Sequence, residues 1–209
     1  MPRSSTLHGS APDNSPYALL VLDLISDFEF EDGARMLRNA LPLAPRIAAL
    51  KQRLKRAGVP TIYVNDNLGR WRSDRTQLIA HCLRETSRAR PLVEQLAPQA
   101  DDYFIMKPKH SGFFGTPLHA LLANIGAKTL ILTGVTSHQC VLFTAVDAYV
   151  REYELIIPRD CIAAMRAEQT RIALDIFRTA LKAETPLASA VRLRSRKAGA
   201  SSRKRRLER

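Results

Sequence analysis

The sequence predicts a three-layer α/β fold, in which a six-stranded, mostly parallel sheet carries helices on both faces. Short apolar runs that favour β-strands alternate along the chain with stretches of helical periodicity, which is typical of βαβ units. The chain has 209 residues, 45% of them hydrophobic, which suits one globular domain with a sizeable core. No internal repeat or change of composition divides residues 17–193, so we expect a single domain there.

The first half of the chain supplies the opening strands. Residues 17–22 (YALLVL) form a continuous apolar run, as expected of a strand that is buried in a parallel sheet. Residues 43–56 carry apolar side chains at helical spacing, and Gly58 is a helix stop signal. A second strand is expected at 60–64 (PTIYV), followed by a polar loop at 65–74.

The second half repeats this alternation. Residues 103–106 (YFIM) and 129–133 (TLILT) are short apolar runs that predict strands, and each is followed by a helical pattern, at 116–124 and 141–149. Right-handed crossovers between such units make the strands parallel. The remaining expected elements are a strand at 154–157 (ELII), an amphipathic helix at 167–182 and a sixth strand at the sheet edge at 189–193.

The net charge of +12 is concentrated at the C-terminal end. Residues 192–209 hold nine Lys or Arg against the single acid Glu208, so we expect a disordered basic tail at 194–209 and a disordered extension at 1–16. We favour a solvated extension over a contact with nucleic acid, which would depend steeply on salt. Deletion of the tail is expected to leave melting temperature and activity nearly unchanged.

The cysteines and the hydropathy pattern predict the compartment. Cys82, Cys140 and Cys161 are an odd number at unrelated spacings, which suits a reducing cytoplasm better than a disulfide framework or a zinc site. No apolar run approaches the length of a membrane span, and the N-terminal residues lack the apolar core of a signal peptide. We therefore expect a cytoplasmic protein with no membrane partner, and a homo-oligomer, dimer or tetramer, that acts on a small molecule.

Three ionisable residues follow three of the expected strands. Asp23, Lys107 and Cys140 each come directly after an apolar run, and the carboxyl ends of parallel strands meet at one edge of the sheet, where ligands bind. Cys140 also lies at the start of a helix, where the dipole favours a thiolate and is expected to lower the thiol pKa. The alternative for a single cysteine is a small buried core residue.

Three segments resemble the isochorismatase-like cysteine hydrolases. They are LDLISDF at 22–28, KPKHSGFFGTPL at 107–118 and TGVTSHQCV at 133–141, in the order and placement of the family motifs. The resemblance spans about residues 17–193 and implies a six-stranded parallel sheet flanked by helices. Members include nicotinamidases, carbamoylsarcosine amidases, ureidoacrylate amidases and vinyl-ether-cleaving isochorismatases.

The resemblance implies a role for each motif residue. Cys140 would attack a carbonyl carbon, Asp23 would accept the thiol proton and pass it to the leaving amine, and Lys107 would stabilise the thiolate. The backbone N–H groups of Thr136 and Cys140 would form the oxyanion hole, with a cis peptide bond between Val135 and Thr136.

The substrate-binding residues that we expect are aromatic or polar neighbours of these motifs. His138 is expected to line the pocket or the helix start rather than to act as the base of a Cys–His pair, and His110 is expected to line the site. The expected substrate-binding set is Phe28, Trp71, Phe113 and His138.

Two departures from the family pattern narrow the activity. Ile25 stands where many members have a Gln. The segment Asn65-Asp66-Asn67 lacks the histidines through which nicotinamidases bind a metal, so Asp66 is expected in a hydrogen-bonded turn. We therefore expect no metal and no cofactor, and the pattern argues against a nicotinamidase.

The sequence thus favours a cysteine-dependent hydrolase that cleaves a small amide or ureide through an acyl-enzyme. One alternative is a vinyl-ether hydrolase, although those enzymes often dispense with the Cys. The other is a non-catalytic α/β binding module whose basic tail binds nucleic acid. A single cysteine at position 140 that reacts rapidly with iodoacetamide near neutral pH would favour the enzyme over the binding module.

Overall fold

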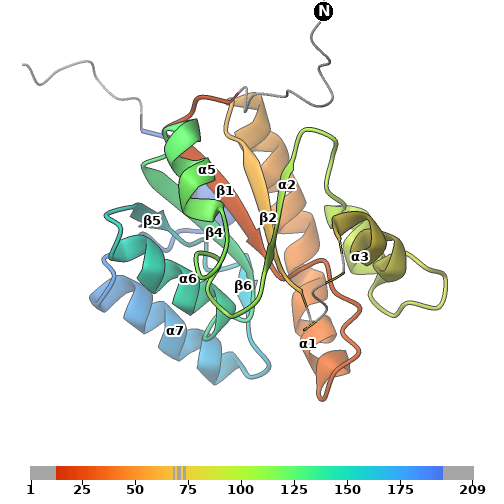
Figure 1. The fold of residues 1–209 in the computed structure, drawn as a ribbon. Coiled ribbons are helices and arrows are strands. Elements are labelled where there is room, and N and C mark those ends of the chain that lie inside the picture. The colour runs from red at the N-terminus through yellow and green to blue at the C-terminus, as the bar shows by residue number, and fades with distance from the viewer. Residues whose placement is uncertain (1–12, 68, 70–71, 73, 195–209) are drawn as a thin grey trace, which may run out of the picture.

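A parallel six-stranded sheet lies between two layers of helices (Figure 1). The computed structural model describes residues 13–67, 69, 72 and 74–194. The strand order is β3-β2-β1-β4-β5, with β6 also paired to β4, and every pairing is parallel. The strands are β1 (Tyr17–Leu22), β2 (Thr61–Asp66), β3 (Tyr103–Lys107), β4 (Thr129–Val135), β5 (Glu154–Ile156) and β6 (Ile162–Ala163).

The helices cover both faces of the sheet. Successive side chains of β1 point to opposite faces and are apolar, so each face needs a helical layer to bury it. Leu19 and Val21 belong to the core under α1, α2 and α4, whereas Leu20 and Leu22 belong to the core under α5, α6 and α7. Both faces of the sheet are therefore dry, which explains the continuous apolar run of this strand. The helices are α1 (Gly33–Ala40), α2 (Ala44–Arg56), α3 (Arg75–Cys82), α4 (Arg90–Leu96), α5 (Leu118–Ile125), α6 (Cys140–Tyr149) and α7 (Ala167–Thr179), with 3₁₀ turns η1 (Leu41–Leu43) and η2 (Ala188–Ala190).

The predicted fold class is confirmed, but the sixth strand is not where the sequence placed it. The expectation of a strand at 189–193 is wrong, because η2 begins this segment and its carbonyls accept hydrogen bonds from the guanidinium of Arg53 on α2. The outer edge of β5 is bridged instead by Glu184. The sixth strand is the two-residue β6, which is too short for a periodicity to reveal.

The loop expected at 65–74 also differs, because β2 continues through Asp66 and α3 begins at Arg75. The helices α1, α3 and α4 have no counterpart among the predicted elements. The predicted extensions lie mostly at 1–12 and 195–209, outside the described residues.

Gly134 on β4 allows the backbones of β4 and β1 to approach closely. It pairs with Leu22 of β1 and has a φ of 115°, and a Cβ atom here would lie 2.0 Å from the Leu22 carbonyl oxygen. We expect Gly134→Ala to lower the free energy of unfolding by ~3 kcal/mol or more, since backbone strain and a backbone clash add together.

Gly58→Ala is the matched control in denaturant unfolding. Gly58 also has a positive φ, 73°, but a Cβ atom there would meet nothing within 4 Å. The control should cost only ~1–2 kcal/mol, the penalty of the left-handed conformation alone. Equal unfolding midpoints for the two variants would contradict the proposed close approach.

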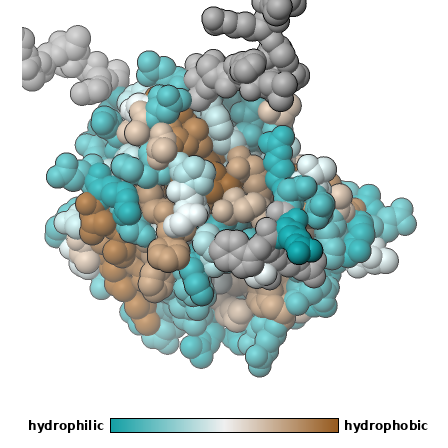
Figure 2. Space-filling model, viewed as in Figure 1, coloured by the Kyte–Doolittle hydropathy of each residue, from teal (hydrophilic) through white to brown (hydrophobic). Residues whose placement is uncertain are grey.

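The surface over α6 carries exposed apolar side chains (Figure 2). Phe143, Val146 and Val150 recur at helical spacing and are 52%, 42% and 65% exposed, and Ile172 of α7 lies exposed on the neighbouring helix. Within the described residues, no helix is long and apolar enough to cross a membrane. The expected homo-oligomer stays a prediction, and light scattering of the purified protein would measure it.

Candidate active site

The ends of three strands bring Asp23, Lys107 and Cys140 together. Asp23 follows β1, Lys107 is the last residue of β3, and Cys140 begins α6 shortly after β4. The Lys107 Nζ atom lies 2.9 Å from Asp23 Oδ2 and 3.6 Å from Cys140 Sγ. The side chain of Lys107 is fully buried, and Cys140 is 9% exposed. The clustering predicted from the sequence is therefore present in the structure.

Backbone contacts fix the Asp23 carboxylate. Asp23 has a φ of 52°, and its N–H donates to the carbonyl of Val64 on the adjacent strand β2. Its Oδ1 accepts a hydrogen bond of 2.6 Å from the backbone N–H of Asp66. The sharp turn after β1 thus directs the carboxylate across the end of β2 towards Lys107.

Asp66 adds a second carboxylate, which the sequence prediction missed as part of this cluster. It is the last residue of β2, not a turn residue, and its Oδ2 lies 3.3 Å from Lys107 Nζ. The parallel register pairs Asp66 directly with Lys107. Asp66 and Lys107 follow the two predicted strands 60–64 and 103–106. An acid and a base that follow successive strands are a signal that could have indicated this contact.

Burial and the neighbouring charges shift the pKa values of this cluster in opposite directions. Burial raises the pKa of Asp23 above its ordinary value, and Lys107 opposes part of that shift. Burial alone would lower the pKa of Lys107, but the neighbouring Asp23, Cys140 and Asp66 raise it, so the ammonium stays protonated. A raised pKa makes Asp23 a stronger proton acceptor once it is ionised.

The prediction of a lowered Cys140 pKa is corrected by the structure. Burial and the nearby Asp23 carboxylate raise the pKa of this thiol, and Lys107 offsets only part of the effect. Burial also raises the pKa of Cys82 and of Cys161 to about 12. All three resting thiols are therefore protonated near neutral pH, so rapid labelling of Cys140 there no longer separates an enzyme from a binding module.

The histidine within reach of Cys140 is His110, not His138. His110 Nδ1 lies 3.8 Å from Cys140 Sγ, and its ring packs 5.6 Å from the ring of Phe143. His138 lies in the turn before α6, where burial and the charge of Arg166 lower its pKa. His110 thus joins Lys107 and Asp23 among the polar side chains around the sulfur, whereas the sequence had assigned it only to the lining of the site.

The turn from β4 into α6 has the geometry that the resemblance implies. The Val135–Thr136 peptide bond is cis. Cys140 is the first residue of α6, so its N–H has no acceptor within the helix. The carbonyl of Thr136 accepts hydrogen bonds from the N–H groups of Gln139 and Val141, which stabilise the turn that leads into Cys140.

Two of the expected substrate-binding aromatics, Phe28 and Phe113, pack into the fold. Phe28 is 1% exposed and belongs to the core under α1 and α2. The ring of Phe113 packs against Tyr153 and the guanidinium of Arg151, which follow the C-terminal end of α6. A ten-residue helix is about 15 Å long, so substrate contact by Phe113 has no support from the structure. Trp71 lies outside the described residues.

The residues of the β2 end do not fit the metal site of a nicotinamidase. The Asn65 side-chain amide donates to the Ile25 carbonyl, and Asn67 Oδ1 accepts from the N–H of Gly69. The Lys107 ammonium already lies between the carboxylates of Asp23 and Asp66. Across the parts of the chain that the structure describes, no group of three His, Cys, Asp or Glu side chains could hold a metal ion.

Hydrolytic activity is expected to survive dialysis against EDTA. Lys107 supplies the positive charge between the two carboxylates, and the neighbouring Asn side chains are engaged in the fold. Activity before and after chelation is the measurement. A loss that added zinc, iron or manganese restores would contradict this and favour a metal-dependent, nicotinamidase-like activity.

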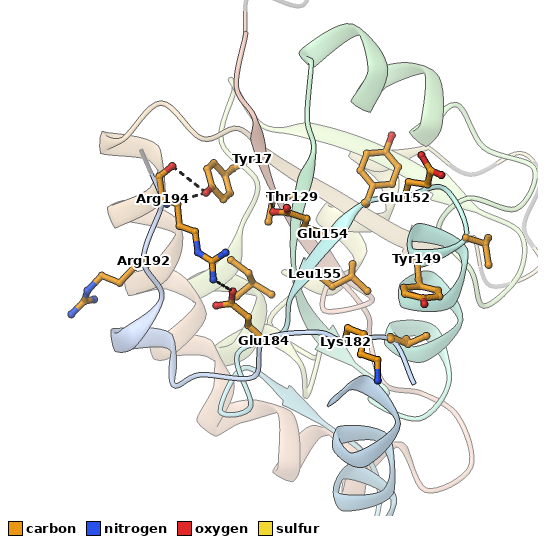
Figure 3. A pocket seen from close by; sticks show the side chains of 14 residues that line it. Tyr17, Thr129, Tyr149, Glu152, Glu154, Leu155, Lys182, Glu184, Arg192 and Arg194 are labelled. Carbon is orange, nitrogen blue, oxygen red and sulfur yellow. Dashed lines mark hydrogen bonds and ion pairs between the residues drawn. The ribbon is translucent and has the colours of Figure 1, made fainter. Parts of the chain in front are cut away.

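A cavity lies at the opposite ends of the strands (Figure 3). Its volume is about 670 Å³, and its lining includes Tyr17, Thr129 and Glu154, which begin β1, β4 and β5. Arg194 crosses it to pair with Glu184. Because Asp23 and Cys140 lie at the carboxyl ends of the sheet, this cavity is separate from their cluster.

The fold and the cluster together define a parallel α/β protein with the side chains of a hydrolase at the carboxyl edge of its sheet. Residues 17–188 match the model of the isochorismatase domain, and the chain belongs to this family. Its members are hydrolases, and this chain is therefore a hydrolase.

Three similar proteins illustrate the range of the family. The uncharacterized isochorismatase family protein YaaI of Bacillus subtilis (strain 168) is 40% identical over 167 residues, which are 80% of this chain and 91% of that protein. The N-carbamoylsarcosine amidase of Thermoplasma acidophilum matches with a TM-score of 0.67 and 27% identity, covering 85% of this chain and 99% of that one. The nicotinamidase of Staphylococcus aureus matches with a TM-score of 0.63 and 26% identity, covering 82% and 98%.

Proposed function

We propose that this protein is a cysteine-dependent hydrolase that cleaves a C–N bond of a small amide or ureide through an acyl-enzyme. The observation that carries the proposal is the position of Lys107 Nζ, 2.9 Å from the Asp23 carboxylate and 3.6 Å from the Cys140 thiol. A nucleophile and a proton acceptor are the groups that acyl transfer needs, and a fixed cation beside both can stabilise the thiolate. The similarity to an amidase supports this choice of bond.

The first half of the reaction uses all three groups. Asp23 accepts the Cys140 proton as the sulfur attacks the carbonyl carbon, and Lys107 stabilises the negative charge that moves from the carboxylate to the sulfur. The N–H groups of Thr136 and Cys140 donate to the oxygen of the tetrahedral intermediate. Asp23 then returns the proton to the leaving nitrogen, the C–N bond breaks, and a thioester with Cys140 remains.

The second half regenerates the enzyme. Asp23 takes a proton from a water molecule, the resulting hydroxide attacks the thioester carbonyl, and the proton returns to the Cys140 sulfur as the C–S bond breaks. The raised pKa of Asp23 suits a group that must both accept and donate a proton. Because the resting thiol is protonated, Asp23 has to remove its proton during the attack itself.

A panel of small primary amides and ureides, with ammonia release as the readout, tests the proposed function. The proposal expects turnover of at least one compound by the wild-type protein. The panel should also include a vinyl ether of the isochorismate type. Cleavage of the vinyl ether that survives loss of the Cys140 thiol, with no amide cleaved, would establish the alternative hydrolase instead.

We also propose that the protein works in the cytoplasm. All three cysteines are free and buried, and none is paired. Unpaired thiols are typical of a reducing compartment, which supports this location. Fractionation of cells that produce the protein, followed by immunoblotting, would test it.

A further inference from the structure

We propose that Asp66 is a positioning residue that shares the charge of Lys107, leaving Asp23 able to accept the proton of Cys140. This inference rests on the proposed function, which assigns the proton transfer to Asp23. It concerns a residue outside the Asp23–Lys107–Cys140 cluster that the sequence predicted.

Asp66 touches both members of the acid–base pair, by different atoms. Its Oδ2 lies 3.3 Å from Lys107 Nζ, and its backbone N–H donates to Asp23 Oδ1 at 2.6 Å. The parallel register of β2 and β3 places Asp66 directly beside Lys107. The contact is therefore built into the sheet and does not depend on a surface loop.

The charges explain why a second carboxylate is useful. Lys107 is fully buried, and a buried cation with a single carboxylate partner would hold that partner strongly in its ionised, weakly basic form. With Asp66 as a second anion, the attraction that Lys107 exerts on Asp23 is partly cancelled. The Asp66 side chain is 33% exposed and that of Asp23 is 13% exposed, so the two carboxylates reach Lys107 from a wetter and a drier side.

The arrangement has an opposite consequence for the thiol. Each anion near Lys107 weakens the electrostatic stabilisation that this cation gives to a Cys140 thiolate. The Asp66 carboxylate therefore favours proton uptake by Asp23 and disfavours the thiolate, whereas the backbone N–H of Asp66 lowers the Asp23 pKa and stays in place when the side chain is changed. A side chain that served only to shape the end of β2 would have neither effect.

Asp66→Asn separates charge from shape. The substitution keeps the size of the side chain and leaves in place the backbone N–H that binds Asp23, but it removes the negative charge. We expect alkylation of Cys140 by iodoacetamide, followed by mass spectrometry of the modified peptide, to move to lower pH by about one unit. On the best amide of the panel, kcat should fall about tenfold with KM little changed, and the acid limb of the rate profile should also move to lower pH.

Two further variants complete the experiment. Asp66→Glu restores the charge and should recover part of the wild-type pH profile. Asp101→Asn removes a carboxylate that pairs with Lys55 on the surface, 63% exposed, and should shift neither profile.

The inference is overturned if Cys140 of the Asp66→Asn variant is alkylated with the wild-type pH dependence. It is also overturned if this variant loses labelling and activity and its melting temperature falls as well. The labelling result does not require a substrate. A shifted labelling profile in a protein that cleaves no compound of the panel would therefore uphold the charge sharing and refute the proposed function.

Discussion

Cys140→Ala should abolish hydrolysis of any amide that the wild-type protein cleaves, with a loss of about 10⁴-fold or more. The thiol is the group that forms the acyl-enzyme, and no other cysteine lies in the cluster with Lys107 and Asp23. The fold should persist, because Ala fits the start of α6 and removes only one sulfur atom from the core. Ammonia release and the melting temperature are the two measurements.

Cys161→Ala and Cys82→Ala are the matched controls. Both thiols are fully buried, as Cys140 nearly is, but neither contacts Lys107. These variants should keep their activity and lose a small amount of stability to the cavity that is left. Full activity of Cys140→Ala would remove covalent catalysis from the proposal.

Asp23→Asn should lower kcat by about 10²–10⁴-fold, the range that a positioned acid or base supplies. It should at the same time make Cys140 easier to alkylate. The Asp23 carboxylate raises the thiol pKa, so its neutral replacement lowers that pKa and increases the thiolate fraction at any given pH. Alkylation by iodoacetamide should therefore proceed at lower pH than in the wild-type protein, although hydrolysis is lost.

The opposing directions of these two readouts make the test specific. A variant that merely disturbs the site would lose activity without moving the alkylation of Cys140 to lower pH. Asp27→Asn is a suitable control, since this nearby carboxylate pairs with His81 of α3 and not with Lys107. An Asp23→Asn enzyme that retains wild-type kcat would exclude Asp23 as the proton acceptor.

The wild-type acid limb follows from the same group. Burial raises the Asp23 pKa above the ordinary value of 3.8, and only the ionised carboxylate can take the thiol proton. Activity should therefore be full at pH values above the raised pKa and fall as pH decreases through it.

The chain itself determined the sheet and the order of the chemical groups. The apolar runs of β1 and β4 are continuous because both faces of these strands are buried. A strand that is buried on both faces has consecutive apolar residues, which can be recognised in the sequence without a structure. Asp23 and Cys140 were found for a related reason, since each follows such a run and the ends of parallel strands share one edge.

Only the tertiary structure decided which neighbours those groups meet. Asp66 and Lys107 are 41 positions apart in the chain, and their contact depends on the register between β2 and β3. The two-residue β6 forms because β4 offers it an edge, and no local pattern specifies a strand so short. The direction of the Cys140 pKa shift likewise could not be predicted from the sequence. Proximity to a helix start favours the thiolate, but burial and a carboxylate from another strand act through space and outweigh it.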